Sequence, residues 1–274
     1  MTTNNPTSTM RALLWQGMSA TALKCLAAGL MLLDHIHQMF AVQGASLWLT
    51  MLGRPVFPIF LFVCAESFHY THSRTQYLKR LLFASWGMTV LTFVLQRTVP
   101  NDDVVLMNNA FSTFFVASMF MFCWDLFKEG IAQKSAKRLG QALLCGLMPL
   151  IGAIPLYLVA MASFNPNISD TAIQALAALA LLVPNILAVE GGSAMVALGV
   201  AFYILRNHRL LQIMVLLALS LLTYVAGGGI QWMMAFAAIP MLLYNGQRGR
   251  GMKHFFYIFY PAHLVVLYLL SAWL

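Results

Sequence analysis

The feature that most constrains this chain is a succession of apolar stretches, each about long enough to cross a lipid bilayer as a helix. A helical span needs roughly 20 apolar residues, so a chain of 274 residues made largely of such stretches has little length left for other domains. Charged residues are 9% of the sequence, whereas they are about a quarter of an average soluble domain. The sequence therefore predicts an all-α polytopic membrane protein without a separate soluble catalytic domain.

Most of the stretches are clear, but the region 171–205 is ambiguous. It contains two short apolar pieces, Thr171–Val189 and Ala194–Leu205, separated by Glu190 and a pair of glycines. Such a break would suit a broken helix that lines a cavity. We expect a bundle of about nine to ten transmembrane helices, nine if one piece is re-entrant and ten, slightly favoured, if both cross. The clear stretches are 22–42, 46–70, 78–98, 104–126, 139–161, 210–226, 229–244 and 254–273.

The charges between the stretches set the expected orientation. Basic residues gather around 74–80 and 128–138, whereas the connections at 43–46 and 162–171 carry neither Lys nor Arg. Because Lys and Arg concentrate in cytoplasmic loops, we expect the N-terminus and both basic connections in the cytoplasm. The chain then consists of a polar cytoplasmic tail, 1–20, without a cleaved signal peptide, and a single transmembrane domain, 21–274. These loops explain the net charge of +8, so no nucleic-acid partner is expected.

The first stretch combines the apolarity of a span with charged side chains. It carries Lys24, Asp34, His35 and His37. A charge at membrane depth costs from about 2.5 kcal/mol upward, so such residues usually face a protein interior and often mark a functional site. Lys24 and His35 are eleven residues apart, close to three helical turns, which places both on one helix face about 16 Å apart.

The second stretch offers partners for these charges. The first two spans run antiparallel, so His35 and Arg54 are expected at similar depth when counted from the outer ends. Counted from the inner ends, Lys24 and Glu66 are expected at similar depth. The sequence therefore predicts an outer polar layer that joins Asp34, His35 and Arg54, and an inner pair. Structural ion pairs that lock the two helices together explain both layers as well.

Two later spans bring further polar side chains to a similar depth. The fourth span begins near Asn109 and Thr113, and the last carries Tyr260 and His263. Amide and hydroxyl groups in membrane helices often only bond a neighbouring helix. For Asn109 and Thr113 a structural role and a role at a site therefore both stay open. A second deep histidine favours a site.

An imidazole acting as general base fits these residues best. Histidine titrates near neutral pH, the adjacent carboxylate of Asp34 is expected to orient it and favours its imidazolium, and an arginine can stabilise an oxyanion. A metal site of Asp34, His35, His37 and His263 is not expected, because the first two histidines point in different directions on a helix. No serine occupies a recognisable nucleophile elbow. The cysteines, which lie in apolar segments without metal-type spacing, are Cys25, Cys64, Cys123 and Cys145.

These residues lie in stretches that resemble the TraX family, membrane proteins named for acetylation of conjugative F-type pilin. The similar stretches follow one another along nearly the full chain: LKCLAAGLMLLDHI, GRPVFPIFLFVCAESFHYTHSRTQYLKRLL, NNAFSTF, the EGG turn at 190–192, and YNGQRGRGMKHFFYIFYPAHLVVLYL. Two positions depart from the family pattern. Its acidic-Tyr-Gly turn reads Glu190-Gly191-Gly192 here, and its Glu-Gly after the second span reads Glu66-Ser67, which leaves the acceptor open.

The resemblance implies an acyltransferase of the bacterial inner membrane that takes acetyl from cytoplasmic acetyl-CoA and passes it to an amine or hydroxyl of pilin or a glycan. Lys24 corresponds to a cytoplasmic-side cation of related acyltransferases, and His35 to their histidine three turns later. The expected catalytic residues are His35, Asp34, Arg54 and His263. The expected substrate-binding residues are Lys24, Glu66, Asn109, Thr113, Glu190 and Tyr260. The expected contacts of the CoA phosphates, each equally explained by membrane topology, are Arg74, Lys79 and Arg80, together with Arg248 and Arg250 if their glycine-rich loop is cytoplasmic.

Two other classes of function remain open. A proton-coupled transporter would also use intramembrane acids and histidines, although the internal repeat common in transporters is absent. A non-enzymatic factor for pilus or secretion assembly would tolerate substitution of Asp34, His35 and Arg54 with no loss beyond folding. The lipid bilayer and acetyl-CoA are the expected partners, no metal is expected, and the oligomeric state stays open.

Overall fold

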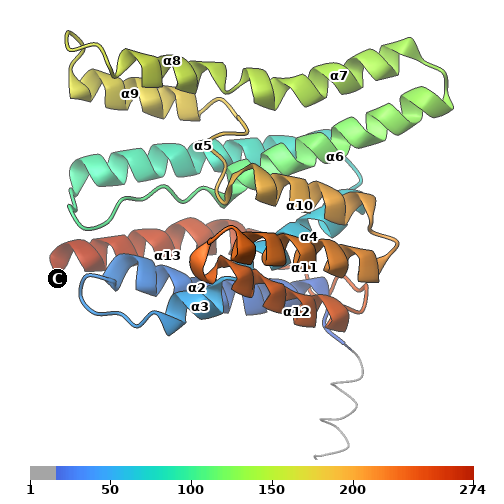
Figure 1. Ribbon diagram of the computed structural model, residues 1–274, viewed down its shortest axis with the longest axis horizontal. Helices are drawn as coiled ribbons and strands as arrows, with labels where there is room; N and C mark the ends of the chain where they lie inside the picture. The colour runs from blue at the N-terminus through green and yellow to red at the C-terminus, as the bar shows by residue number, and fades with distance from the viewer. Residues whose placement is uncertain (1–16) are drawn as a thin grey trace, which may run out of the picture. The chain divides into compact units, whose positions relative to one another are not determined.

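The computed structural model describes residues 17–274 (Figure 1), and residues 1–16, most of the predicted polar tail, lie outside the described part. All regular elements between 17 and 274 are helices, so the predicted all-α class is confirmed. The chain is a membrane protein, since five helices in this range are long and apolar enough to cross a bilayer. They are Trp48–His69, Arg74–Thr98, Ala110–Ala132, Ala136–Ala162 and His254–Trp273.

Length and composition separate these five helices from the other predicted spans. Helix α2 (Ala20–Phe40) has 21 residues, but its Lys, Asp and His side chains lower its hydropathy and it is not among the five. Four other apolar segments have 10–17 residues, fewer than the roughly 20 that a bilayer requires. The prediction of nine or ten spans therefore exceeds the five helices that qualify. The shorter segments are α9 (Asp170–Leu181), α10 (Gly192–Ile204), α11 (Arg209–Val225) and Gly229–Leu243.

The ambiguous region, 171–205, is interrupted at the glycine pair, as the sequence predicted. Gly191 and Gly192 have φ angles of 76° and 75°, a left-handed conformation that costs glycine little, and α10 begins at Gly192. The preceding piece was predicted to reach Val189, but α9 ends at Leu181. Pro184 follows closely and disfavours helix before it. The prediction was therefore too long by eight residues.

The described chain divides into two compact units, each made of two sequence segments. Unit 1 contains the residues up to Val63 together with His208–Tyr260, and unit 2 contains Cys64–Asn207 and Pro261–Leu274. Helices α4 (Val56–His69) and α13 (Lys253–Trp273) contribute to both units. The single domain expected over 21–274 stays a prediction.

Unit 1 is built around α2 and its second segment, His208–Tyr260. α2 packs against α3 (Trp48–Gly53), while α11 packs against η1 (Gly229–Ala237), a 3₁₀ helix, and α12 (Ala238–Leu243). The chain just before α2 pairs with the segment after α12. The Met18 N–H donates to the Leu243 carbonyl at 2.6 Å, and the Asn245 N–H donates to the Met18 carbonyl at 3.0 Å. The two segments of unit 1 are therefore joined at the start of α2.

Unit 2 is organised around α6 (Ala110–Ala132), which packs against α5 (Arg74–Thr98), α7 (Ala136–Ile151) and α10. Side-chain caps fix where several of these helices begin, because a cap oxygen accepts an otherwise free N–H. Ser73, Asn109, Ser135 and Ser169 cap α5, α6, α7 and α9 in this way. α7 continues into α8 (Ile154–Ala162), which packs against α9.

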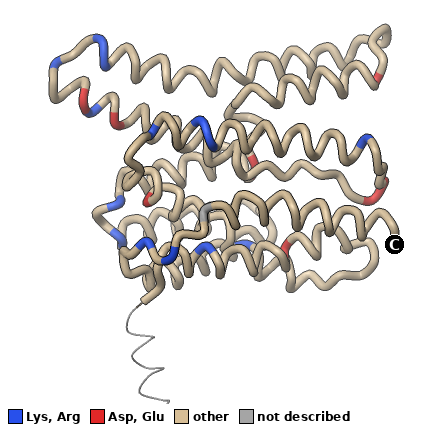
Figure 2. Tube along the Cα trace, turned by 180° about the vertical axis from the view of Figure 1, so that it is seen from behind, with Lys and Arg blue, Asp and Glu red and all other residues tan. Residues whose placement is uncertain are grey.

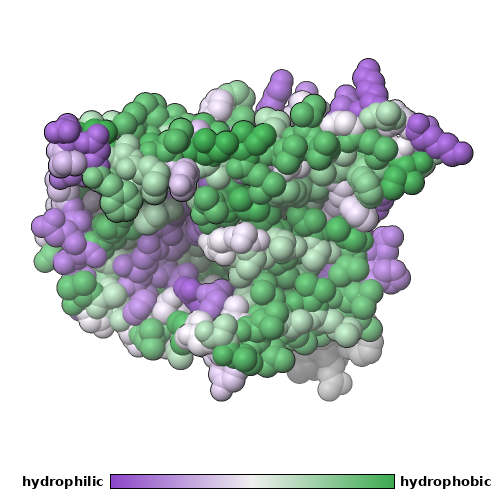
Figure 3. Space-filling model, turned by 45° about the horizontal axis from the view of Figure 1, so that its top comes forward, coloured by the Kyte–Doolittle hydropathy of each residue, from purple (hydrophilic) through white to green (hydrophobic). Residues whose placement is uncertain are grey.

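The surface of unit 2 has the distribution of charge that a membrane protein requires. Figure 2 shows that most of its Lys and Arg positions gather at the end that holds the α6–α7 connection. The faces of α7 and α8 are hydrophobic in Figure 3, and exposed side chains there include Leu143, Leu144, Met148 and Leu158. Such an apolar face between polar ends is suited to contact with lipid.

Candidate functional site

Helix α2 carries the central residues of the site. It begins after Ser19, whose hydroxyl accepts a hydrogen bond from the Ala22 N–H at 3.2 Å. Its buried residues follow one stripe at helical spacing, which includes Leu23, Met31 and His35. His35 is only 4% exposed. An imidazole is thus part of an otherwise apolar stripe.

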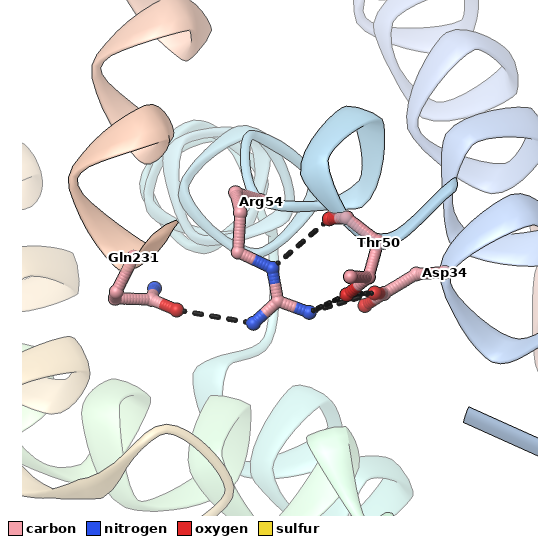
Figure 4. Close-up of polar contacts among 4 residues, drawn as sticks. All are labelled: Asp34, Thr50, Arg54 and Gln231. Carbon is pink, nitrogen blue, oxygen red and sulfur yellow. Dashed lines mark hydrogen bonds and ion pairs between the residues drawn. The ribbon is translucent and has the colours of Figure 1, made fainter. Parts of the chain in front are cut away.

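The neighbouring carboxylate, Asp34, forms an ion pair with Arg54. Nη2 of Arg54 lies 2.6 Å from Oδ1 of Asp34, which confirms the predicted pairing of these two residues. The Thr50 hydroxyl donates to the same carboxylate oxygen, and Nη2 of Arg54 also donates to that hydroxyl at 2.6 Å. On its other side, Nη1 of Arg54 donates to Oε1 of Gln231 at 3.1 Å. We call Asp34, Thr50, Arg54 and Gln231 the polar layer (Figure 4).

The polar layer fixes the orientation of the arginine. Nε of Arg54 donates to the backbone carbonyl of Thr50 at 3.1 Å, so all three guanidinium nitrogens are used. The side chains of Arg54 and Asp34 are 26% and 23% exposed, and their attraction is therefore screened less than that of a fully exposed pair. A planar cation held from three segments, α2, α3 and η1, is suited to stabilise a negative oxygen at a defined position.

Gly53 is required by the close approach of α3 to α2. A Cβ atom at this position would overlap the side chain of Asp34 at its Cβ, Cγ and Oδ1 atoms. Gly53 directly precedes Arg54 and is buried. The absence of a side chain at residue 53 is therefore what lets the carboxylate reach the arginine.

His35 also has an aromatic neighbour within unit 1. Its ring centroid lies 6.4 Å from that of Tyr260, a residue that is 6% exposed. His37, by contrast, has Nδ1 3.1 Å from the carbonyl of Ala45 in the connection after α2. The two histidines of α2 thus have different surroundings, as their spacing predicted.

Lys24 lies near the start of α2, close to a glycine-rich loop. Its Nζ is 5.8 Å from the ring centroid of Phe256. The Thr21 hydroxyl donates to the carbonyls of Arg248 at 3.0 Å and Arg250 at 2.6 Å. Gly249 packs against the start of α2 with a φ of +72°. The backbone of Arg248 and Arg250, whose side chains are exposed, is thereby anchored beside the helix that carries Lys24 and His35.

Three of the predicted substrate-binding residues have structural partners in unit 2. Asn109 caps α6, since its Oδ1 accepts the Ser112 N–H at 3.2 Å, and its amide donates to Ser85 and Thr89 of α5. The buried Thr113 hydroxyl donates to the backbone carbonyl of Glu190 at 3.0 Å. These bonds give Asn109 and Thr113 a role in joining segments of unit 2. This is the structural role, one of the two alternatives that the sequence left open for them.

The remaining predicted residues also lie in unit 2. Glu66 and His263 are both 8% exposed. Arg74 forms an ion pair with Asp125 at 2.6 Å, and the Arg80 guanidinium lies 5.9 Å from the ring of Tyr77. Lys79 is exposed. Their participation in a site with the polar layer stays a prediction.

Two members of the polar layer, Thr50 and Gln231, were not predicted from the sequence. Thr50 precedes Arg54 by one helical turn, and this i, i+4 spacing was a usable signal. Gln231 is 177 residues away from its arginine and lies on a 3₁₀ helix, so no local pattern identified it. Among the described residues, no group of three or more His, Cys, Asp or Glu side chains is arranged to hold a metal ion.

Comparison with protein families identifies a relationship that covers nearly the whole chain. The family model described as TraX protein matches residues 19–271, which include α2, the polar layer and the loop that follows α12. No curated protein and no solved structure matches the chain.

Proposed function

Because the chain belongs to the TraX family, we propose that it is an acetyltransferase of the bacterial inner membrane, with acetyl-CoA as donor and an amine or hydroxyl as acceptor. Membership of the family indicates a pilin-related function in conjugation. A pilin amine is therefore the first acceptor to test, with a glycan hydroxyl second.

The observation that carries the proposal is the surroundings of His35. This buried imidazole directly follows Asp34, whose carboxylate binds a guanidinium held on all its nitrogens. Lys24 lies three turns earlier on the same helix face. A base, a fixed cation and a second cation nearer the helix start are the groups that acyl transfer from a thioester requires.

In the proposed reaction, His35 accepts the proton of the acceptor amine or hydroxyl as that group attacks the thioester carbonyl. Arg54 stabilises the negative oxygen of the tetrahedral intermediate. The carbon–sulfur bond then breaks, and the imidazolium returns its proton to the leaving thiolate of CoA. Asp34 was expected to orient His35, but its bonds to Thr50 and Arg54 support the role of holding the arginine instead.

The donor would enter from the cytoplasmic side. CoA carries phosphates, which cations attract, and the exposed Arg248 and Arg250 lie beside the start of α2. The positive-inside rule predicts the N-terminus, and with it the start of α2, on the cytoplasmic side. The roles predicted for His263 and Glu66 stay predictions.

The test compares His35→Ala with His37→Ala, a matched histidine on the same helix. The purified chain in detergent is incubated with radiolabelled acetyl-CoA and pilin, and both free CoA and acetylated pilin are measured. Loss of a general base costs on the order of 10²–10⁴-fold in rate, so His35→Ala should lose transfer while His37→Ala stays within a few-fold of wild type.

Thermal unfolding and size-exclusion chromatography establish that each variant is folded. Wild-type rates in a folded His35→Ala protein would remove the imidazole from the reaction. A folded wild type that neither binds nor consumes acetyl-CoA would favour the transporter or assembly functions.

A further inference from the structure

A second group of charged residues lies in unit 2, around Asp125 of α6. Its carboxylate, whose side chain is 9% exposed, forms an ion pair with Arg74 at 2.6 Å and lies 3.6 Å from the ammonium of Lys128. The buried hydroxyl of Tyr203, on α10, donates to it at 2.6 Å. The carboxylate therefore already has a close cation and a close hydroxyl.

Two further groups lie against the ring of Tyr203. The Arg206 guanidinium is 5.3 Å from the ring centroid, and its Nη1 donates to the Tyr203 carbonyl at 3.4 Å. The ring of His69 is 6.4 Å from the same ring, and the charges of Arg206, Arg74, Asp125 and Lys128 all act on this imidazole. We call His69, Arg74, Asp125, Lys128, Tyr203 and Arg206 the Asp125 cluster. It has three permanent cations and one carboxylate.

Two nitrogen atoms of the cluster are buried without a hydrogen-bond partner among residues 17–274: Nε of Arg206 and Nδ1 of His69. A buried donor left unsatisfied costs about 1–3 kcal/mol, and native proteins satisfy nearly all such groups. The excess positive charge and the unused guanidinium donor both favour an anion as the missing partner.

The position of the cluster at helix ends also favours a phosphate ligand. His69 ends α4, Arg74 begins α5, and Arg206 follows the end of α10. Helix ends rich in Arg, Lys and Tyr are typical of the membrane interface, and basic pockets between membrane helices bind phospholipid head groups. The N-terminus of α5 adds a partial positive charge that favours an anion.

We propose that the Asp125 cluster binds a phosphate group, with Arg206 and His69 as direct contacts. Asp125 and Tyr203 hold the cations in position. Phosphate oxygens form short, charge-assisted hydrogen bonds with guanidinium, which would satisfy the free Nε–H of Arg206. An anionic phospholipid and coenzyme A both carry such a group. The proposal does not depend on acetyl transfer, because binding alone defines the site.

The test measures binding to the full chain in phosphatidylcholine nanodiscs. In one arm phosphatidylglycerol is added to the lipid, and in the other coenzyme A is titrated into pure phosphatidylcholine nanodiscs. The variants are Arg206→Gln and the control Arg138→Gln. The control makes the same substitution at an arginine outside the cluster, whose partner is the surface residue Glu129. Arg206→Lys keeps the charge but lacks the Nε–H, and it serves if Arg206→Gln does not fold.

We expect at least one phosphate ligand to raise the unfolding temperature of the wild type. Its apparent Kd should rise about tenfold in Arg206→Gln, the size expected for one charge-assisted hydrogen bond, and stay unchanged in Arg138→Gln. Response to phosphatidylglycerol alone assigns the site to lipid, and response to coenzyme A assigns it to the acyl donor. Equal responses of Arg206→Gln and Arg138→Gln, or no response of the wild type, would overturn the proposal.

Discussion

The ion pair between Asp34 and Arg54 makes a quantitative prediction that a double-mutant cycle can test. The cycle consists of Asp34→Asn, Arg54→Gln and the double variant. Each single change leaves one member of the polar layer with an unpaired charge, whereas the double change leaves two neutral amides. The cost of the two single changes should therefore exceed the cost of the double change.

The expected coupling free energy follows from the geometry. Hydrogen bonds to charged groups contribute about 1.5–3 kcal/mol when well buried, and Nη2 of Arg54 lies 2.6 Å from the carboxylate of Asp34. Side-chain exposures of 26% and 23% admit some solvent screening, which lowers the value towards that of surface pairs. We expect a coupling of about 1–2 kcal/mol, within the range measured for residues in contact.

Reversible unfolding in mixed micelles, followed by circular dichroism, provides the free energies. The control is the same cycle on Glu129 and Arg138, whose nitrogen and oxygen are 3.7 Å apart and whose side chains are 45% and 44% exposed. A surface pair of this kind should give about 0–0.5 kcal/mol. If the two cycles gave equal coupling, the polar layer would be no more than a surface contact and the reasoning would fail.

Three further changes test other contacts. Gly53→Ala should displace the side chain of Asp34 and cost about 1–3 kcal/mol of unfolding free energy, with transfer activity lost together with the ion pair; a variant as stable and active as wild type would contradict the close packing. Thr21→Val removes both hydrogen bonds to the 245–251 loop, so the apparent Kd of acetyl-CoA should rise several-fold at unchanged kcat, and an unchanged Kd would refute the role of the loop. Asn109→Ala removes a helix cap and should cost about 0.5–2 kcal/mol with little effect on kcat in the folded fraction; a large loss of kcat would instead indicate contact with substrate.

Helix positions and the central pair could be predicted from the sequence because both follow local rules. The apolar stretches gave the helices, and counting depth along two antiparallel spans brought Asp34 and Arg54 together. The end of α9 was within reach as well, since Pro184 stands three residues beyond Leu181. The position of Asn109 before α6 was recognisable as a helix cap, but its amide was interpreted as a possible contact of a substrate.

The remaining contacts required the three-dimensional structure. Gln231 reaches Arg54 across 177 residues from a 3₁₀ helix where a transmembrane span was predicted. The Asp125 cluster assembles from α4, α5, α6 and α10, and its acid appeared in the sequence only as one charge inside an apolar stretch. Such clusters depend on which helix faces meet, and hydropathy alone does not specify that.

The division of unit 1 into two distant segments has a consequence for synthesis. A ribosome makes residues 64–207 before it makes the second segment of this unit, and domains fold only as their residues emerge. During that interval the N-terminal helices are in the bilayer without the hydrogen bond between Arg54 and Gln231. We expect nascent chains that stop before His208 to insert and then be cleared by membrane proteases, because the polar layer is complete only after translation has passed Gln231.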